Sequence, residues 1–232
     1  MNHWPRAILF DFDGVIVNSE PLHFHAFQKV LAAEKITLSE EEYYRELIGF
    51  DDRGAFGYLF DKRKIKIEPK DLIRLMRRKS EMVTELIKEQ KYQALPGVEK
   101  FVRGVWRHYP LAICSGALRG EIETMLEGVG LRDCFTTIIA AEDVTVGKPD
   151  PQGYLLCMKE LSQKVNVALK PEDCLVIEDA PSVIKTVKSV GFQTLGVATS
   201  HDIAQLGEAN WKVNTLDPAE VLKQLPKLKL GI

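Results

Sequence analysis

The sequence predicts an α/β fold in which a three-layer α/β/α core with a parallel sheet carries a small all-helical domain inserted after its first strand. The core is indicated by short apolar runs that alternate with helical patterns, because this alternation is typical of parallel β-α-β units. The insertion is indicated by a long stretch with helical spacing and no strand pattern. The expected domains are residues 1–17 with 93–232 for the core and residues 18–92 for the helical insertion.

The elements follow in order along the chain. The first strand is predicted at residues 6–10, an apolar run that ends at the Asp-Phe-Asp-Gly segment beginning with Asp11. Helical spacing occupies residues 22–31 and 72–87, and no convincing strand lies between residues 17 and 92. A loop or boundary is expected at residues 95–97. The later strands are expected at residues 111–114, 137–140, 174–177 and 194–197, with helices at 121–126, 153–161 and 183–190.

Composition narrows the class of protein. The chain of 232 residues is 45% hydrophobic and 28% charged, which is ordinary for a globular protein and argues against disorder. A net charge of −2 and only short basic clusters argue against a nucleic-acid partner. The apolar run before Asp11 is too short for a signal peptide or a membrane span, and the four cysteines form no C-x-x-C pair. We therefore expect a cytoplasmic protein without a membrane partner, and a monomer is favoured.

Polar residues that are able to bind ligands or take part in catalysis stand where the predicted strands end. Parallel strands end at one edge of a sheet, where open α/β sheets bind ligands, so we expect these side chains to converge. They are Asp11 and Asp13 after the first strand, Ser115 after the second, Lys148 in a loop before a helix, and Glu178 and Asp179 after a later strand.

The carboxylates in this set predict a metal site. Asp11 and Asp13 are two positions apart on an extended stretch, so their side chains would share a side. With Glu178 and Asp179 nearby, four carboxylates would repel one another unless a cation were present. Hard oxygen donors without histidine or thiol select Mg²⁺. Lys148 adds a compact positive charge suited to a phosphate oxygen or a crowded nucleophile.

A second group of donors surrounds Ser115. Its hydroxyl and the amides of Gly116 and Ala117, expected at a helix N-terminus, are suited to hydrogen-bond a phosphoryl group. Taken singly, a serine like Ser115 is more often an N-cap, a lysine like Lys148 is more often a surface residue, and Asp-x-Asp-Gly is also a turn sequence. The joint pattern, in which polar residues end buried strands in a β-α-β context, favours a phosphoryl-transfer site.

Four motifs follow one another along the chain: Asp11-Phe12-Asp13-Gly14-Val15-Ile16, then Ser115, then Gly147-Lys148-Pro149-Asp150-Pro151, then Ile177-Glu178-Asp179. In order and spacing they resemble the four motifs of the haloacid dehalogenase superfamily. The segment Asn18-Ser19-Glu20-Pro21-Leu22-His23 is similar to the start of the helical cap in the phosphoglycolate phosphatase-like and β-phosphoglucomutase-like branch. The resemblance covers essentially the whole chain and implies a Rossmann-like core with a helical cap domain.

The resemblance also implies roles at the matching positions. Asp11 would be the nucleophile that forms an aspartyl-phosphate, and Asp13 would be the general acid/base and offer its backbone carbonyl to Mg²⁺. Ser115 and Lys148 would hold the phosphoryl group. The implied Mg²⁺ ligands are Asp11, Asp13 and Asp179, with help from Glu178.

Two departures from the branch pattern stand out. Asn18 occupies a position where Asp is usual, so one outer carboxylate is missing. Ala180-Pro181-Ser182-Val183 replaces the more usual Ser-x-x-Gly after Glu-Asp. Neither departure removes a core catalytic group.

Residues in the predicted cap indicate the substrate class. His23, Arg53 and Lys79 stand at positions resembling those that contact substrate in the mutase branch, although each is also compatible with an ordinary surface or packing role. Gly49 and Gly54 flank a segment that predicts a loop able to bring Arg53 towards the site. A closed helical cap excludes macromolecules, so we expect a small phosphorylated metabolite.

Three functions fit these residues. A Mg²⁺-dependent phosphatase is favoured over a sugar-phosphate mutase, because the mutase pattern Ser-x-Ser-Lys-Asn is replaced by Ser115-Gly116-Ala117-Leu118-Arg119. Arg119 would partly substitute for the missing Lys-Asn pair in binding a second phosphate. A non-catalytic phosphate- or metal-binding module is disfavoured, since a pure binder needs no nucleophile beside a general acid.

Overall fold

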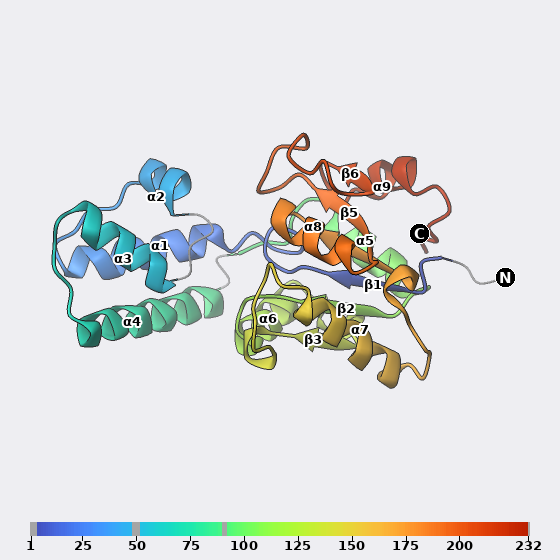
Figure 1. Cartoon of the computed structure of the whole chain (residues 1–232), viewed down its shortest axis with the longest axis horizontal. Helices are drawn as coiled ribbons and strands as arrows, with labels where there is room; N and C mark the ends of the chain where they lie inside the picture. Colours follow the sequence, from blue (N-terminus) through green and yellow to red (C-terminus); the bar gives the residue numbers. More distant parts are fainter. Residues whose placement is uncertain (1–3, 48–51, 90–91, 232) are drawn as a thin grey trace. The chain divides into compact units, whose positions relative to one another are not determined.

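The computed structural model describes residues 4–47, 52–89 and 92–231. The chain divides into two compact units (Figure 1). The core unit comprises Met1–Asn18 and Tyr92–Ile232, and the helical unit comprises Ser19–Lys91. Within the described ranges, no helix has both the length and the apolar composition that crossing a membrane requires.

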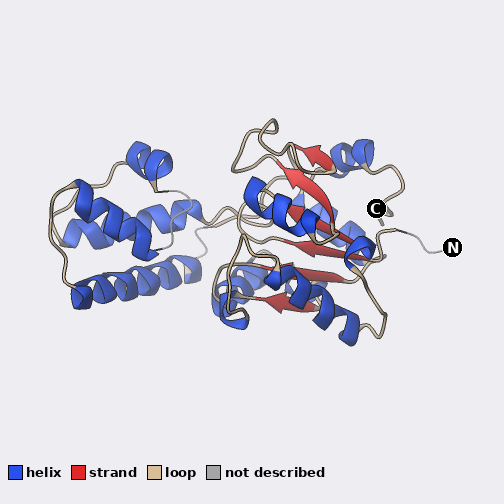
Figure 2. Cartoon of the chain, in the orientation of Figure 1, coloured by secondary structure: helices blue, strands red, loops and turns tan. Residues whose placement is uncertain are grey.

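The core unit is built on a parallel sheet, whose strands are red in Figure 2. The described strands follow the order β3-β2-β1-β4-β5-β6. The strands are β1 Ala7–Phe10, β2 Leu111–Cys114, β3 Thr137–Ile139, β4 Cys174–Glu178, β5 Gln193–Val197 and β6 Trp211–Val213. The first four are buried along their whole length, which is typical of a parallel sheet covered on both faces. The predicted α/β class is therefore confirmed. β6 escaped prediction because it is short and half exposed.

Helices cover both faces of this sheet. They are α5 Val98–Trp106, α6 Arg119–Gly128, α7 Gln152–Lys164, α8 Pro181–Ser189 and α9 Pro218–Gln224, with the short 3-10 helices η1 Arg132–Cys134, η2 Ala141–Asp143 and η3 Pro171–Asp173. Leu9 packs in one core cluster with Tyr154 of α7 and Val183 of α8. Phe10, the next residue, places its ring 6.2 Å from that of Phe101 in α5. Because adjacent strand residues point to opposite faces, these contacts define a three-layer core.

The helical unit is inserted between two paired segments of the core unit. Val17 and Ala94 form an isolated antiparallel bridge. Beside it, the Leu95 amide donates a hydrogen bond of 2.9 Å to the Ile16 carbonyl oxygen. The predicted boundary at residues 95–97 is the turn that leads from this bridge into α5, and Gly97 is the N-cap of that helix.

The described residues of the helical unit form helices and no strand, as the sequence predicted. The helices are α1 Glu20–Ala33, α2 Glu40–Glu46, α3 Asp52–Lys62 and α4 Pro69–Lys88. Their shared core includes Phe27 of α1, Phe56 of α3 and Leu75 of α4. The helical patterns predicted at residues 22–31 and 72–87 correspond to α1 and α4.

The predicted loop around Arg53 is wrong for the residues that the structure describes. Arg53 and Gly54 lie in the first turn of α3, and the side chain of Arg53 is exposed. The apolar residues Ala55, Phe56 and Leu59, which are spaced for one helix face, outweigh the local effect of the glycine. The rest of that predicted loop, residues 49–51, lies outside the described residues.

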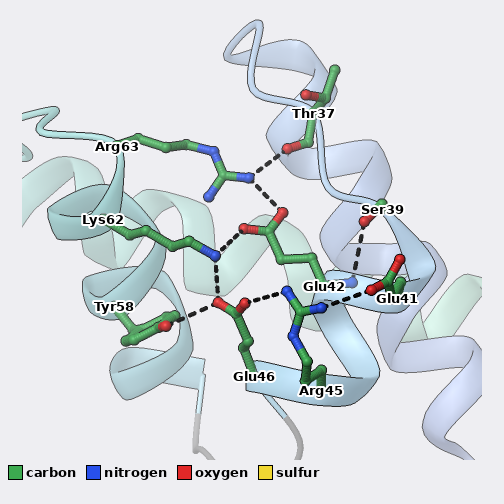
Figure 3. Close-up of polar contacts among 9 residues, drawn as sticks. All are labelled: Thr37, Ser39, Glu41, Glu42, Arg45, Glu46, Tyr58, Lys62 and Arg63. Atoms are coloured by element: carbon green, nitrogen blue, oxygen red, sulfur yellow. Dashed lines mark hydrogen bonds and ion pairs between the residues drawn. The ribbon is translucent and has the colours of Figure 1, made fainter.

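Charged side chains join α2 to α3 (Figure 3). Lys62 donates to Glu42 at 2.9 Å and also binds Glu46, while Arg63 binds the other oxygen of Glu42 at 2.8 Å. Burial raises the pKa of Glu42, but the combined effect of Lys62 and Arg63 is larger and opposite. The pKa of Glu42 therefore lies below its ordinary value. Within α2, Tyr43 is the buried residue, so these ion pairs supplement a small apolar contact.

We predict that Gly97→Ala destabilises the core unit. Gly97 has φ of +83°, which alanine disfavours, and an added Cβ would lie 2.5 Å from the backbone nitrogen of Asp217. The free energy of unfolding, measured by urea denaturation, should fall by about 3 kcal/mol. Gly120→Ala is the control, because its Cβ would meet nothing within 4 Å in α6 and should leave stability unchanged or slightly raised. Equal stability of the two variants would contradict the role of Gly97.

Candidate active site

The candidate site lies in the core unit, at the carboxyl edge of the sheet. The strand register places Phe10 opposite Ile113 of β2 and opposite Ile177 of β4. The residues that follow these three positions therefore reach the same edge, as predicted. Glu178 is the last residue of β4, and Asp179 comes directly after it.

The loop after β1 turns sharply around one carbonyl group. The Phe12 carbonyl oxygen accepts hydrogen bonds from the amides of Ile16, at 2.8 Å, and Val17, at 3.2 Å. Gly14 has φ of +76°, and a Cβ on it would lie only 2.1 Å from Oδ2 of Asp179. Glycine is therefore required here both by the backbone conformation and by the close approach of the carboxylate.

The same loop is tied to the segment that follows β5. The Thr199 hydroxyl donates a hydrogen bond to the Gly14 carbonyl oxygen. The neighbouring Ser200 hydroxyl hydrogen-bonds the Asp179 carboxylate. Two strand-end loops that are far apart in the sequence thus hold each other at the site.

Acidic side chains gather around Asp11. Within the described part of the chain, Asp11, Glu178 and Asp179 are buried and each offers an oxygen within 4.8 Å of the others. Asp13 is not one of these three residues, and the crowding of a fourth carboxylate stays a prediction. The chain bends at Phe12, so the strand alternation assumed between Asp11 and Asp13 does not continue.

The group fits a hard divalent cation. Burial and Glu178 raise the pKa of Asp11 well above its usual value, although Lys148 opposes this shift. Burial and Glu178 likewise raise the pKa of Asp179 to about 7. These shifts arise from desolvated, mutually repelling carboxylates, which a cation would stabilise. The donors are all carboxylate oxygens, the ligand type that suits Mg²⁺.

Lys148 supplies a positive charge within this group. Its Nζ lies 2.6 Å from Oδ1 of Asp11 and 2.7 Å from Oε1 of Glu178. Burial lowers the pKa of Lys148, but the two carboxylates raise it more, so the net shift is upward. The side chain therefore stays an ammonium. The sequence placed Lys148 in a loop before a helix, and α7 begins four residues later.

Glu178 is fully buried and engaged through both oxygens. Oε1 accepts from Lys148 at 2.7 Å and from the Tyr154 hydroxyl at 3.3 Å. Oε2 accepts from the amides of Asp179 and Ala180, each at 2.8 Å. A carboxylate has about four lone-pair sites, and these four contacts occupy them.

The segment after β2 differs from its prediction. Ser115 is buried, and its hydroxyl accepts a hydrogen bond of 3.0 Å from the Ala117 amide. Helix α6 begins at Arg119 with Leu118 as its N-cap, so Gly116 and Ala117 lie in a loop before the helix rather than at its N-terminus. The Ala117 amide is therefore committed to Ser115.

Arg119 is held by contacts with residues in and beside β3 and η2. Its guanidinium forms an ion pair with Asp143 of η2 and donates to the Ile138 carbonyl oxygen at 3.0 Å. Its backbone amide donates to Glu142. These contacts bind the start of α6 to the segment after β3.

The three predicted cap residues lie in the helical unit. Lys79 of α4 is 4% exposed, with its Nζ 2.6 Å from Nδ1 of His23 in α1 and 2.7 Å from Oδ1 of Asp52 in α3. It also lies 5.0 Å from the centre of the Phe27 ring. Burial and Lys79 lower the pKa of His23 to about 3, so this histidine is neutral. The structure thus joins His23 and Lys79, while Arg53 is exposed on α3.

Sequence reasoning missed several residues that contact the site. Tyr154 gave no signal, because it stands in a segment whose pattern indicates only a helix. Thr199 and Ser200 did carry a signal, since they follow a predicted strand at residues 194–197 just as Asp11 and Ser115 follow theirs.

Comparisons with known proteins agree with this geometry. A family model described as haloacid dehalogenase-like hydrolase matches residues 8–197. The Phosphorylated carbohydrates phosphatase of Thermotoga maritima is 29% identical over 229 residues, covering 96% of this chain and 99% of the relative. Fructose-1-phosphate phosphatase YqaB of Escherichia coli is 27% identical over 193 residues, covering 82% and 95%. The crystal structure of a putative β-phosphoglucomutase from Thermotoga maritima matches with a TM-score of 0.75 at 29% identity, covering 94% of this chain and 98% of that one.

The resemblance inferred from the motifs is therefore confirmed. The matched residues include Asp11, Ser115 and Lys148, together with Glu178 and Asp179. The match spans well over half of the chain, and the chain belongs to the haloacid dehalogenase-like hydrolase family.

Proposed function

We propose that this protein is a Mg²⁺-dependent phosphatase that hydrolyses a small phosphorylated metabolite through an aspartyl-phosphate on Asp11. The observation that carries the proposal is the buried Asp11 carboxylate, held 2.6 Å from the Lys148 ammonium and within 4.8 Å of Asp179. The relatives named for action on phosphorylated carbohydrates and on fructose 1-phosphate support the substrate class. The four buried cysteines carry free thiols, which supports a reducing, cytoplasmic compartment.

The first chemical step is nucleophilic attack by Asp11 on phosphorus. Lys148 and the Phe12 amide both bind Oδ1 of Asp11, at 2.6 Å each, so we assign the attack to Oδ2. As the bond from Asp11 to phosphorus forms, the bond from phosphorus to the alcohol oxygen breaks, and Asp13 gives that oxygen a proton. The alcohol leaves, and the phosphoryl group remains on Asp11.

The second step returns the enzyme to its starting state. Asp13, now a carboxylate, takes a proton from a water molecule whose oxygen attacks phosphorus. The bond between phosphorus and Asp11 breaks, and inorganic phosphate is released. Ser115 and the Gly116 amide donate hydrogen bonds to the phosphoryl oxygens in both steps.

The acidic residues divide into two kinds. Asp11, Asp179 and the backbone carbonyl of Asp13 would hold Mg²⁺, which when bound offsets the negative charge of the phosphoryl group and the carboxylates. Glu178, whose lone pairs are already occupied, orients Lys148 and the backbone of Asp179.

In the helical unit, we propose that His23, Arg53 and Lys79 bind the substrate. An ammonium has three N–H donors, and among residues 4–47, 52–89 and 92–231 Asp52 and His23 account for two of those on Lys79. The third donor of this buried cation is suited to an oxygen of a sugar or phosphate.

A sugar-phosphate mutase is the second candidate, because the similar Thermotoga maritima structure is a putative β-phosphoglucomutase. The contacts of Arg119 argue against it. Nη2 of its guanidinium binds Asp143 and the Ile138 carbonyl oxygen, which favours a structural role for Arg119 over replacement of the missing Lys-Asn pair. The pairing of Asp11 with Lys148 also argues against a non-catalytic binding module, because binding alone does not require a nucleophile.

We predict that Asp11→Asn lowers kcat at least about a thousandfold, because an amide does not act as this nucleophile. The fold should persist, since the amide nearly matches the carboxylate in shape and removes a repelling charge. Circular dichroism and urea denaturation check the fold, and hydrolysis of p-nitrophenyl phosphate measures kcat. Asp133→Asn, at an exposed position in η1, is the matched control and should retain full activity. Normal turnover by folded Asp11→Asn would overturn the assignment.

A second prediction concerns the metal. Excess chelator should abolish hydrolysis, Mg²⁺ should restore it, and Ca²⁺ should inhibit because its larger, looser coordination misaligns the reacting groups. Asp179→Ala should raise the Mg²⁺ concentration for half-maximal activity by about tenfold or more. Asp133→Ala should leave that concentration unchanged. Undiminished activity in excess chelator would contradict the proposed metal dependence.

The products distinguish a phosphatase from a mutase. We predict steady release of inorganic phosphate from sugar monophosphates, because water accepts the phosphoryl group from Asp11. Conversion of β-glucose 1-phosphate to glucose 6-phosphate should be negligible even with a bisphosphate primer. Both products are measured in one reaction. Rapid isomerisation with little free phosphate would show that the protein is a mutase.

A further inference from the structure

A tyrosine that the proposed chemistry does not use contacts the candidate site from within the core. Tyr154 of α7 is 0% exposed, and its ring lies 6.4 Å from that of Phe192 in the same apolar cluster. Its hydroxyl lies 3.3 Å from Nζ of Lys148 and 3.3 Å from Oε1 of Glu178. A buried phenol hydroxyl needs a hydrogen-bond partner, and this one has two charged partners.

The direction of both hydrogen bonds follows from the chemistry of the groups. An ammonium only donates and an ionised carboxylate only accepts, whereas a phenol does both. Lys148 therefore donates to the Tyr154 oxygen, and Tyr154 donates to Glu178. The hydroxyl bridges the two charges in one defined orientation.

This bridge completes the surroundings of the Lys148 ammonium. Its three N–H donors match three acceptors, which are Oδ1 of Asp11, Oε1 of Glu178 and the Tyr154 hydroxyl. Nζ also lies 5.0 Å from the centre of the Tyr154 ring, within the range of a cation–π contact. Tyr154 thus contacts the ammonium through both its hydroxyl and its ring.

We propose that Tyr154 is a positioning residue that holds Lys148 against Asp11 during phosphoryl transfer, an inference that rests on the proposed phosphatase function. Without the hydroxyl, one N–H of the ammonium loses its acceptor and the Lys148 side chain gains freedom to leave Asp11. Loss of the hydroxyl therefore impairs the alignment of the Asp11 nucleophile and leaves substrate binding unchanged. The bonds from Glu178 to the backbone of Asp179 use the other oxygen and are untouched.

Tyr154→Phe tests the proposal, because it removes the hydroxyl and keeps the ring that packs in the core. With p-nitrophenyl phosphate and saturating Mg²⁺, kcat should fall about tenfold, a modest loss because the two contacts are longer than the ion pairs. KM and the Mg²⁺ concentration for half-maximal activity should change by less than about twofold. Phe192→Leu is the control, since it disturbs the same packing without touching the hydroxyl. It should lower the stability to urea and leave kcat unchanged.

The outcomes separate this inference from the proposed function. A wild-type kcat in Tyr154→Phe would overturn the role of Tyr154, and so would an equally large loss of kcat in Phe192→Leu. In either case, hydrolysis by the wild-type protein would still support the proposed phosphatase function. A wild-type protein with no Mg²⁺-dependent hydrolysis of phosphate esters would overturn the proposed function and this role with it. A selective fall in kcat in Tyr154→Phe supports both.

Discussion

Lys148 brings an ammonium to 2.6 Å from Asp11 and 2.7 Å from Glu178, at a place where little water is left to screen charge. A buried ion pair of this kind gives little net stability, because both ions lose their hydration. Breaking one costs about 3–5 kcal/mol, since the remaining charge is left buried and unpaired. The pairing therefore acts less as a source of stability than as a constraint on the protonation state. Burial raises the pKa of Asp11, and Lys148 is the group that opposes this and favours the carboxylate form.

The surrounding backbone explains how such a charge arrangement is kept in place. Asp11 directly follows β1 and Glu178 ends β4, two adjacent parallel strands whose register is fixed. The amide of Asp11 donates to the Ile177 carbonyl oxygen at 2.9 Å, so the two strand ends cannot slide past each other. The contacts of Thr199 and Ser200 add a third strand end to the same assembly. Elements of the sheet, rather than independent loops, set the distances between the acidic groups.

Much of this arrangement could be predicted from local patterns, and the rest depends on contacts between distant residues. The strands and the polar residues at their ends were predictable, because apolar runs and their interruptions are properties of short segments. The path of the backbone at Asp13 was not, because it depends on the bend at Phe12 and on the bridge that Asp13 forms with Val17. The burial of Lys79 required α3 and α4 to pack together. Tyr154 could not be distinguished by sequence from any other aromatic residue on the buried face of a helix.

The bridge between Val17 and Ala94 has a consequence for how this kind of molecule diversifies. These two residues are direct partners across antiparallel backbone, so the chain that leaves the core unit returns at the adjacent position. In geometric terms the junction is the stem of a hairpin, and the stem is closed by hydrogen bonds of the core unit itself. The entropic cost of lengthening a closed loop grows only slowly with its length. The junction can therefore carry inserts of very different size without disturbing the strand ends beside it.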